Sequence, residues 1–437
     1  MVAVIIAVLG FLYFRPGATA PGNNGTGTNF FAQFNPFGTR PTPPTVTPPV
    51  DVSGYTPPES SPTASKLMKI STMPIAGFTV FSKERLKEVP VAPAVPTTET
   101  LPTTTKKTKK VAPTSPPTEF AEALRYVAKA TGNIYQTFVD KIEERKFSTT
   151  VIPKVYDAYF GNHGESVAMR YLKTDGNTIE TFVGNLPKEL LGADTTANNE
   201  IKGSFLPDNV EDISVSPDTS KIFYLFDSQN SSRGNMVGTI LNFSNNKKVQ
   251  IFDSPFTEWL SGWPNNNMIT LSTKPSGEAL GYMYTTDSAG NNLSKILGDI
   301  NGLTTLASPS GKLILYADNN LSLGIYHTDT RNSDILSLKT LPEKCVWGQV
   351  SDVVYCAVPK LASAGEYPDT WYRGEVSFND QLWKIDVKTG NATMIADSAT
   401  IAGGEEIDGT KLTLDENENY LFFINKKDSF LWGLKLR

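Results

Sequence analysis

The chain has 437 residues, and 39 % of them are hydrophobic, a low value for a protein that is globular throughout. The deficit lies in the first third, where Pro and Thr dominate, whereas core-forming content is ordinary from about residue 119 onward. The formal net charge is −5, so the chain lacks the broad cationic surface that holds a phosphate backbone, which argues against nucleic acid as a partner.

The chain begins with an uncharged apolar run, VAVIIAVLGFLYF, at residues 2–14. A helix of this length spans roughly 20 Å, less than the ~30 Å hydrocarbon core of a bilayer. Three alternatives remain: the outer part of a membrane helix that starts upstream, the core of a secretory signal, or a helix in a cytoplasmic core. Residues 18–20 have the small-x-small form of a cleavage site, but Pro21 argues against cleavage. We predict that residues 1–14 form a membrane anchor or a signal helix. The protein is then either a single-pass membrane protein, with the rest of the chain outside the cytoplasm, or a secreted protein.

Residues 15–65 are rich in Pro, Thr, Gly and Asn, which bury too little apolar surface to offset the entropy of ordering. We predict an extended, disordered linker here. A second low-complexity segment, at residues 82–118, interrupts the following domain and carries a Lys-rich run at residues 106–110. The predicted folded domain occupies residues 66–437.

From about residue 151 onward one unit recurs: an apolar strand, a tight polar turn, a second apolar strand and two further strands. Pro-Asp and Pro-Ser-Gly suit such turns, because Pro presets φ and Gly, Asn or Asp tolerates the bend. The turn centres, mostly 40 to 55 residues apart, are Gly164, Asp218, Asn266, Ser310, Val350 and Asn417. This spacing is typical of β-propeller blades.

An earlier unit is split around the low-complexity segment: residues 74–81 are its predicted innermost strand, and residues 126–149 supply the other three. The last unit has only three strands, so we predict that residues 66–71 (KLMKIS) pair with it and close the ring, which leaves no exposed sheet edge there. The sequence therefore predicts an all-β propeller of seven four-stranded blades. Six or eight blades remain open, because residues 187–201 are hard to place.

The segments PDTSKIFYL and PSGKLILYA resemble the repeats of TolB-like and WD40-like (PD40) propellers, and the likeness covers the blade turns from about residue 150 to the end. The layout as a whole is similar to uncharacterised membrane-anchored propeller proteins of small uncultured bacteria. This resemblance implies a binding or scaffolding role at the cell envelope, and it implies no catalytic residues.

Known catalytic patterns are missing from the sequence. The chain has two histidines, His163 and His327, and we expect neither to bind a metal, because no second histidine is near either one. We find no G-x-S-x-G nucleophile motif and no glycine-rich phosphate loop. We therefore predict no catalytic, metal or cofactor site, and we expect Asp218, Glu405, Glu406 and Asp408 to be solvated loop charges.

The two cysteines flank the predicted turn at Val350-Ser351 symmetrically, with Cys345 five residues before Val350 and Cys356 five residues after Ser351. In a hairpin they face each other on adjacent strands, close enough for a disulfide. One bridge is the simplest expectation for an exported protein; two buried thiols are the alternative.

The same blade contains an insertion at residues 359–380 that is rich in residue types common at binding hot spots. Its candidate partner-binding residues are Tyr367, Asp369, Trp371, Tyr372 and Arg373. Alternatively, the aromatic side chains fold back and cap the propeller.

Three functions remain open at this stage. The favoured one is a non-enzymatic binding or scaffolding module, tethered to the cell membrane and recognising an envelope protein or a cell-wall polymer. The second is a structural surface or adhesion protein. The third is a carboxylate-dependent glycan lyase or hydrolase, for which two acids about 5 to 10 Å apart would have to face the channel.

Overall fold

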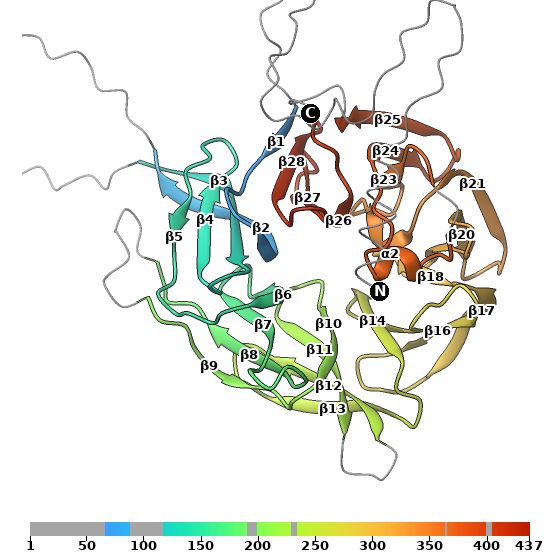
Figure 1. Cartoon of the computed structure of the whole chain (residues 1–437), viewed down its shortest axis with the longest axis horizontal. Helices are drawn as coiled ribbons and strands as arrows, with labels where there is room; N and C mark the ends of the chain where they lie inside the picture. The colour runs from blue at the N-terminus through green and yellow to red at the C-terminus, as the bar shows by residue number, and fades with distance from the viewer. Residues whose placement is uncertain (1–65, 88–116, 190–198, 229–233, 363–364, 399–403) are drawn as a thin grey trace, which may run out of the picture. The chain divides into compact units, whose positions relative to one another are not determined.

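The computed structural model describes residues 66–87, 117–189, 199–228, 234–362, 365–398 and 404–437. These residues form seven antiparallel four-stranded sheets set around a central axis (Figure 1). The predicted seven-bladed all-β propeller is therefore confirmed. The predicted N-terminal helix, the linker and most of the low-complexity segment lie outside the described residues.

Each blade is one sheet, and its strands follow one another outward from the axis. Blade 1 consists of β2 (Ile75–Leu86), β3 (Thr118–Ala128), β4 (Ile134–Phe138) and β5 (Arg145–Lys146). Blade 2 consists of β6 (Val155–Gly161), β7 (Ser166–Leu172), β8 (Ile179–Asn185) and β9 (Lys202–Phe205). Blade 3 consists of β10 (Val210–Val215), β11 (Lys221–Ser228), β12 (Asn235–Asn242) and β13 (Lys248–Ser254). Blade 4 consists of β14 (Trp259–Asn265), β15 (Met268–Thr273), β16 (Leu280–Thr286) and β17 (Ser294–Asn301). Blade 5 consists of β18 (Thr304–Ala307), β19 (Leu313–Ala317), β20 (Ser322–His327) and β21 (Ser333–Lys339).

Blade 6 carries the two short helical elements assigned to the described residues. Its strands are β22 (Cys345–Trp347), β23 (Val353–Pro359), β24 (Asp380–Asp386) and β25 (Ala392–Asp397). The 3-10 turn η2 (Pro342–Lys344) precedes β22, and α2 (Asp369–Tyr372) lies in the insertion between β23 and β24. Within the described residues, no helix is both long and apolar enough to span a bilayer.

Blade 7 closes the ring with both ends of the domain. It consists of β26 (Gly409–Leu414), β27 (Tyr420–Asn425), β28 (Leu431–Lys435) and β1 (Leu67–Lys69), with β1 outermost and antiparallel to β28. Leu67 pairs with Leu434, and Lys69 pairs with Trp432. The predicted closure by the KLMKIS segment is therefore confirmed.

The first strand of each blade lies closest to the axis (Figure 1). Neighbouring first strands contact one another, as β2 does with β6 and β10 with β14. The approach is tightest at Gly77, where a Cβ would lie 2.0 Å from the carbonyl oxygen of Ala158. Only glycine allows the two backbones to come this close.

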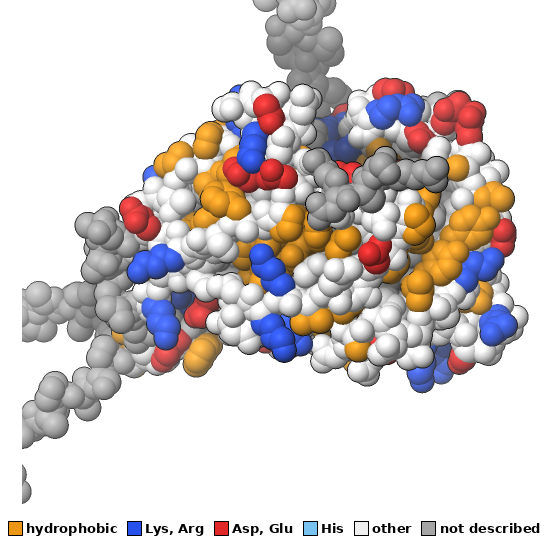
Figure 2. All heavy atoms as spheres, turned by 90° about the horizontal axis from the view of Figure 1, so that it is seen from below, with side chains coloured by type: hydrophobic (Ala, Val, Ile, Leu, Met, Phe, Trp, Pro, Cys, Tyr) orange, Lys and Arg blue, Asp and Glu red, His pale blue; other side chains and the backbone are white. Residues whose placement is uncertain are grey.

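The apolar core lies between adjacent blades. Second strands such as β11 and β19 are nearly continuous apolar runs, because both of their faces are covered by neighbouring blades. Trp259, Trp263 and Trp347 on the first strands are buried. Outermost strands such as β13 and β17 are largely exposed. Figure 2 shows the rim of the propeller, where apolar patches alternate with single charged side chains.

One boundary differs from the sequence-based expectation. β2 continues to Leu86 and β3 begins at Thr118, so the first hairpin extends into the segment assigned to the low-complexity insertion. Arg85 pairs with Glu119, and Leu86 pairs with Thr118, so the two strands stay in register up to the end of β2 and the start of β3. An ion pair between the side chains of Arg85 and Glu119 stabilises this extension.

Candidate functional site

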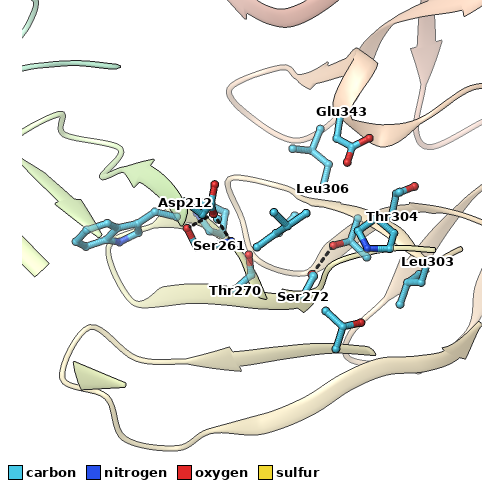
Figure 3. A pocket seen from close by; sticks show the side chains of 16 residues that line it. Asp212, Ser261, Thr270, Ser272, Leu303, Thr304, Leu306 and Glu343 are labelled. Atoms are coloured by element: carbon cyan, nitrogen blue, oxygen red, sulfur yellow. Dashed lines mark hydrogen bonds between the residues drawn. The ribbon is translucent and has the colours of Figure 1, made fainter. Parts of the chain in front are cut away.

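The first strands all begin on the same face of the propeller, which we call the upper face. Because adjacent strands are antiparallel, the loops between the second and third strands lie on this face as well, and the insertion of blade 6 is one of them. A pocket of about 390 Å³ lies beside the axis, lined by β14, β15 and β18 of blades 4 and 5. Asp212 of β10 and Glu343 of η2 complete its wall, on different sides in Figure 3.

Glu343 is the most distinctive ionisable group in this pocket. Tyr372 in α2 donates a hydrogen bond to its Oε1 atom. Its Oε2 atom is buried and has no hydrogen-bond partner among the described residues. Burial raises the pKa of Glu343 to about 7, although the Tyr372 hydroxyl favours the charged form. The carboxyl group therefore changes its charge near neutral pH, and one of its oxygens is buried without a hydrogen bond to the described residues.

Two further polar groups in the pocket wall have no partner in the described part of the chain: Thr304 Oγ1 on β18 and Trp263 Nε1 on β14. Buried polar groups in folded proteins are normally hydrogen-bonded, and each exception costs free energy. Around them the wall combines hydroxyl groups with apolar side chains (Figure 3). The residues that line the pocket therefore hold unmet hydrogen-bonding capacity next to a partly apolar surface.

Asp212, the second carboxylate of the pocket, already has partners. It accepts hydrogen bonds from Ser261 N at 2.6 Å and from Ser261 Oγ at 2.7 Å. Burial nevertheless raises its pKa above the usual value. Asp212 thus orients the start of β14 and contributes polarity to the pocket.

In a second group of charges, near the axis, a single carboxylate is paired with two cations. Arg170 donates to Asp157 Oδ2 at 3.2 Å and to the carbonyl oxygen of Val210 at 2.6 Å, and Lys411 pairs with the other oxygen of Asp157. Burial disfavours the charged form of Asp157, but these two cations hold its pKa below the usual value. The contacts join blades 2, 3 and 7 and leave Asp157 engaged on both oxygens.

The insertion of blade 6 folds back onto the upper face. Tyr367 and Trp371 are only 4 % and 5 % exposed, and they pack with Leu321, Leu341 and Phe378. Asp369 accepts a hydrogen bond from the backbone N–H of Gly277 in blade 4 at 2.6 Å. The rings of Tyr367 and Trp371 thus form a small core of their own, in the folded-back arrangement given above as the alternative. Partner binding by the insertion stays a prediction.

Tyr372 and Arg373 are the members of the predicted set that remain exposed, and Arg373 pairs with Glu375. Partner binding by these two residues stays a prediction. Trp371 has a different role: its indole nitrogen donates to both oxygens of Asp408, at 3.2 and 3.1 Å. Asp408 is fully buried, so the expectation that it is a solvated loop charge is wrong. Glu405 and Glu406 are exposed, as expected.

Cys345 and Cys356 lie opposite each other in the register of β22 and β23, with their Cα atoms 4.1 Å apart. The structure joins their sulfur atoms. For the protein in solution the bridge remains a prediction, and thiol titration is its test.

The two histidines lie apart from the pocket. His163 is in the turn after β6, and His327 ends β20, where its Nε2 lies 2.9 Å from Asp334. The described residues contain no group of three or more His, Cys, Asp or Glu placed to hold a metal ion.

The fold has counterparts among solved structures. Oligogalacturonate lyase from Vibrio parahaemolyticus matches with a TM-score of 0.50 and 9 % identity, over 72 % of this chain and 86 % of that one. An oligogalacturonate lyase in complex with manganese gives 0.47 and 10 %, over 72 % and 85 %, and TolB from Acinetobacter baumannii gives 0.38 and 12 %, over 70 % and 60 %. No family model and no curated protein matches the sequence. At such identity the likeness shows the β-propeller fold alone.

Sequence reasoning missed the pocket, because its polar groups come from different blades. Glu343 precedes β22, Thr304 begins β18 and Asp212 lies on β10, so no local spacing connects them. The sequence does contain one shared feature: each of these residues lies near the start of the first strand of a blade. Since all first strands begin on the same face of a propeller, assigning the residues to blades would have placed them on that face.

Proposed function

We propose that this chain is a non-enzymatic binding module, held outside the cytoplasm by its N-terminal segment, and that it recognises a cell-wall polymer or an envelope protein through the pocket between blades 4 and 5. The observation that carries the proposal is the presence of unpartnered polar atoms on Glu343 and Thr304 in the pocket wall. If the side chains of Glu343 and Thr304 turn toward the pocket, a ligand that donates to Glu343 and bonds to Thr304 restores the hydrogen bonds that these atoms lack.

Of the two ligand classes, the pocket favours a cell-wall polymer. Its volume of about 390 Å³ lies in the range of small-ligand sites, so it suits a short segment rather than a broad protein surface. Hydroxyl, amide and ammonium groups of such a polymer match the carboxyl and hydroxyl groups of the wall. The Leu260, Leu303 and Leu306 side chains suit the apolar face of the same segment.

Co-sedimentation of the full chain with purified insoluble cell wall tests this proposal. Wild type is expected in the pellet, and a Thr304→Val/Glu343→Gln variant is expected to stay in solution. Glu375→Gln is the matched control, because Glu375 is an exposed carboxylate of the blade 6 insertion, outside the pocket, and a hydrogen bond from Arg373 lowers its pKa. Equal sedimentation of all three proteins contradicts the proposal. Capture from an envelope protein fraction, lost in the same variant, assigns the pocket to a protein ligand instead.

A carboxylate-dependent glycan lyase or hydrolase is the second candidate. It is favoured by one observation: Asp212 and Glu343 line the same pocket, and the pKa of each is raised by burial. Release of soluble fragments from the cell wall by wild type, and its loss in Glu343→Gln, would establish this function in place of simple binding. Sedimentation without fragment release supports the binding module.

A further inference from the structure

A buried lysine lies between two buried carboxylates where blades 6 and 7 meet on the upper face. Lys344, the last residue of η2, has its Nζ 2.8 Å from Asp380 Oδ2 and also donates to Asp408 Oδ1. Asp380 begins β24, and Asp408 directly precedes β26. The side chains of all three residues are 0 % exposed. Three reactive groups are thus enclosed together without contact with solvent.

The enclosure around this triad combines aromatic rings with backbone and side-chain polar groups, and Lys344 Nζ also donates to the carbonyl oxygen of Gly409 at 3.0 Å. The Lys344 ammonium lies 5.2 Å from the ring centroid of Trp371 and 5.3 Å from that of Phe378. Taking charged groups out of water is costly, and one lysine cannot neutralise two carboxylates. Proton transfer from the ammonium to a carboxylate would remove two of the three charges and leave a neutral amine beside a neutral carboxylic acid.

The carboxyl groups of Asp380 and Asp408 differ in their hydrogen-bond partners and in the direction of their pKa shifts. Asp408 accepts from Trp371 Nε1, Ser377 Oγ and Phe378 N, and these donors together with Lys344 hold its pKa below the usual value despite burial. Asp380 has a buried Oδ1 with no partner among the described residues, and burial raises its pKa to about 6. Asp380 therefore suits the protonated form, and Asp408 suits the charged form.

We propose that Lys344 and Asp380 condense to an intramolecular amide, with Asp408 as the catalytic carboxylate that relays the proton. The lone pair of the neutral Nζ attacks Cγ of protonated Asp380, and a C–N bond forms. Asp408 accepts a proton from the attacking nitrogen and returns it to the departing hydroxyl group. The Cγ–O bond breaks, and one water molecule leaves. Amine and carboxylic acid are thus converted to amide and water, with no change in oxidation state and no co-reactant.

The fold holds the reacting groups, Lys344 Nζ and the Asp380 carboxyl group, in the positions that this reaction requires. Nucleophile and electrophile are held in contact by folded strands, which makes the condensation intramolecular. Asp380 Oδ2 also accepts from the backbone N–H of Gly409 at 2.7 Å, so the carboxyl group is fixed and its carbonyl polarised. The product ties η2 to β24 next to the cysteine pair at the start of β22, which fastens the innermost and third strands of blade 6.

Peptide mapping of the folded full chain tests the proposal. After reduction, alkylation and tryptic digestion, the amide blocks cleavage after Lys344 and gives one branched peptide, in which residues 340–360 are joined to residues 374–384. Its mass is lower than the sum of the two segments by one water molecule. Separate peptides of residues 340–344, 345–360 and 374–384 show that no bond formed, and this result in folded wild type overturns the proposal.

Two variants and an internal control assign the roles. Asp408→Asn keeps the shape of the site but removes the proton relay, so the branched peptide is expected to be lost; its full recovery contradicts the role of Asp408. Asp380→Asn is expected to give the same branched peptide with loss of ammonia instead of water. The control is the Lys411–Asp157 pair in the same digest, where the lysine side chain is 41 % exposed and no branched peptide is expected.

Discussion

The hydroxyl group of Tyr372 donates a hydrogen bond to the carboxyl group of Glu343, 29 positions earlier in the chain. Tyr372 belongs to the insertion of blade 6, and Glu343 lines the pocket between blades 4 and 5. Through this contact the insertion helps to set the charge state of the pocket, because the hydroxyl group stabilises the carboxylate form of Glu343. The surface loop and the pocket are therefore parts of one site.

Glu343 makes the stability of the fold depend on pH. Because its pKa rises from 4.5 to about 7 on folding, the native state binds the proton more tightly than the unfolded state. Its contribution to the free energy of unfolding is therefore full below pH 4.5 and is lost as the pH rises to about 7. Denaturant unfolding of wild type and Glu343→Gln at a series of pH values should show a difference that declines over this window.

Two outcomes sharpen this test. Tyr372→Phe should move the upper end of the window to higher pH, since the carboxylate loses a donor. A wild-type minus Glu343→Gln difference that is flat across the window contradicts the assignment of the raised pKa to Glu343. Glu375→Gln is the control and should leave the window unchanged.

Closure of the ring by β1 should make a large contribution to stability. Leu67 is 2 % exposed and packs in the core of blades 6 and 7 with Tyr355, Leu412 and Leu434. Leu67→Ala should lower the free energy of unfolding by about 2 to 4 kcal/mol, because it leaves a cavity in that core. The neighbouring exposed residue gives the control, Lys66→Ala, for which urea unfolding should show little change. Similar midpoints for both variants would mean that β1 is not part of the cooperative fold.

The cysteine pair should be oxidised if the domain lies outside the cytoplasm, as proposed above. Titration of the denatured chain is expected to find no free thiol before reduction and two afterwards. Cys345→Ala/Cys356→Ala should lower the free energy of unfolding by about 3 kcal/mol, the loop-closure value for a short loop such as the 11-residue separation here. Two thiols in the untreated protein would support the alternative of buried free cysteines.

Trp371 should matter for stability rather than for partner contact. Trp371→Phe retains an aromatic ring but removes the indole donor from buried Asp408, and it should cost about 1 to 3 kcal/mol in urea unfolding. Arg373→Ala alters an exposed side chain of the same insertion and should change stability by less than about 0.5 kcal/mol. The reverse order of the two effects would contradict the buried position of the indole.

The fold could be predicted from the sequence because each blade carries its own local signal. The turns at Asp218 and Ser310 combine residues that favour tight bends with apolar strands on either side, and their spacing counts the blades. The closure by residues 66–71 followed from the last blade, which lacked one strand. These signals lie within a few residues of one another, so no three-dimensional information was needed.

The functional groups carried no such signal. Lys344, Asp380 and Asp408 are separated by 36 and 28 positions, and each has an ordinary local context. Asp408 follows two exposed glutamates and resembles them in sequence, but the meeting of blades 6 and 7 buries it. The aromatic residues of the insertion were recognised as a distinct feature, whereas the side that they face depends on contacts with blades 4, 5 and 7.

The most direct test of the binding role is to place a photo-crosslinking amino acid in the pocket. Leu260 of β14 lines the pocket, and Ile335, 69 % exposed on the outermost strand of blade 5, is the control position. With a benzoylphenylalanine at Leu260 of the full chain, illumination of the protein bound to isolated cell envelopes should give an adduct with cell-wall polymer, and Glu343→Gln should reduce it. No adduct at Leu260, or equal labelling at Leu260 and Ile335, would contradict the account.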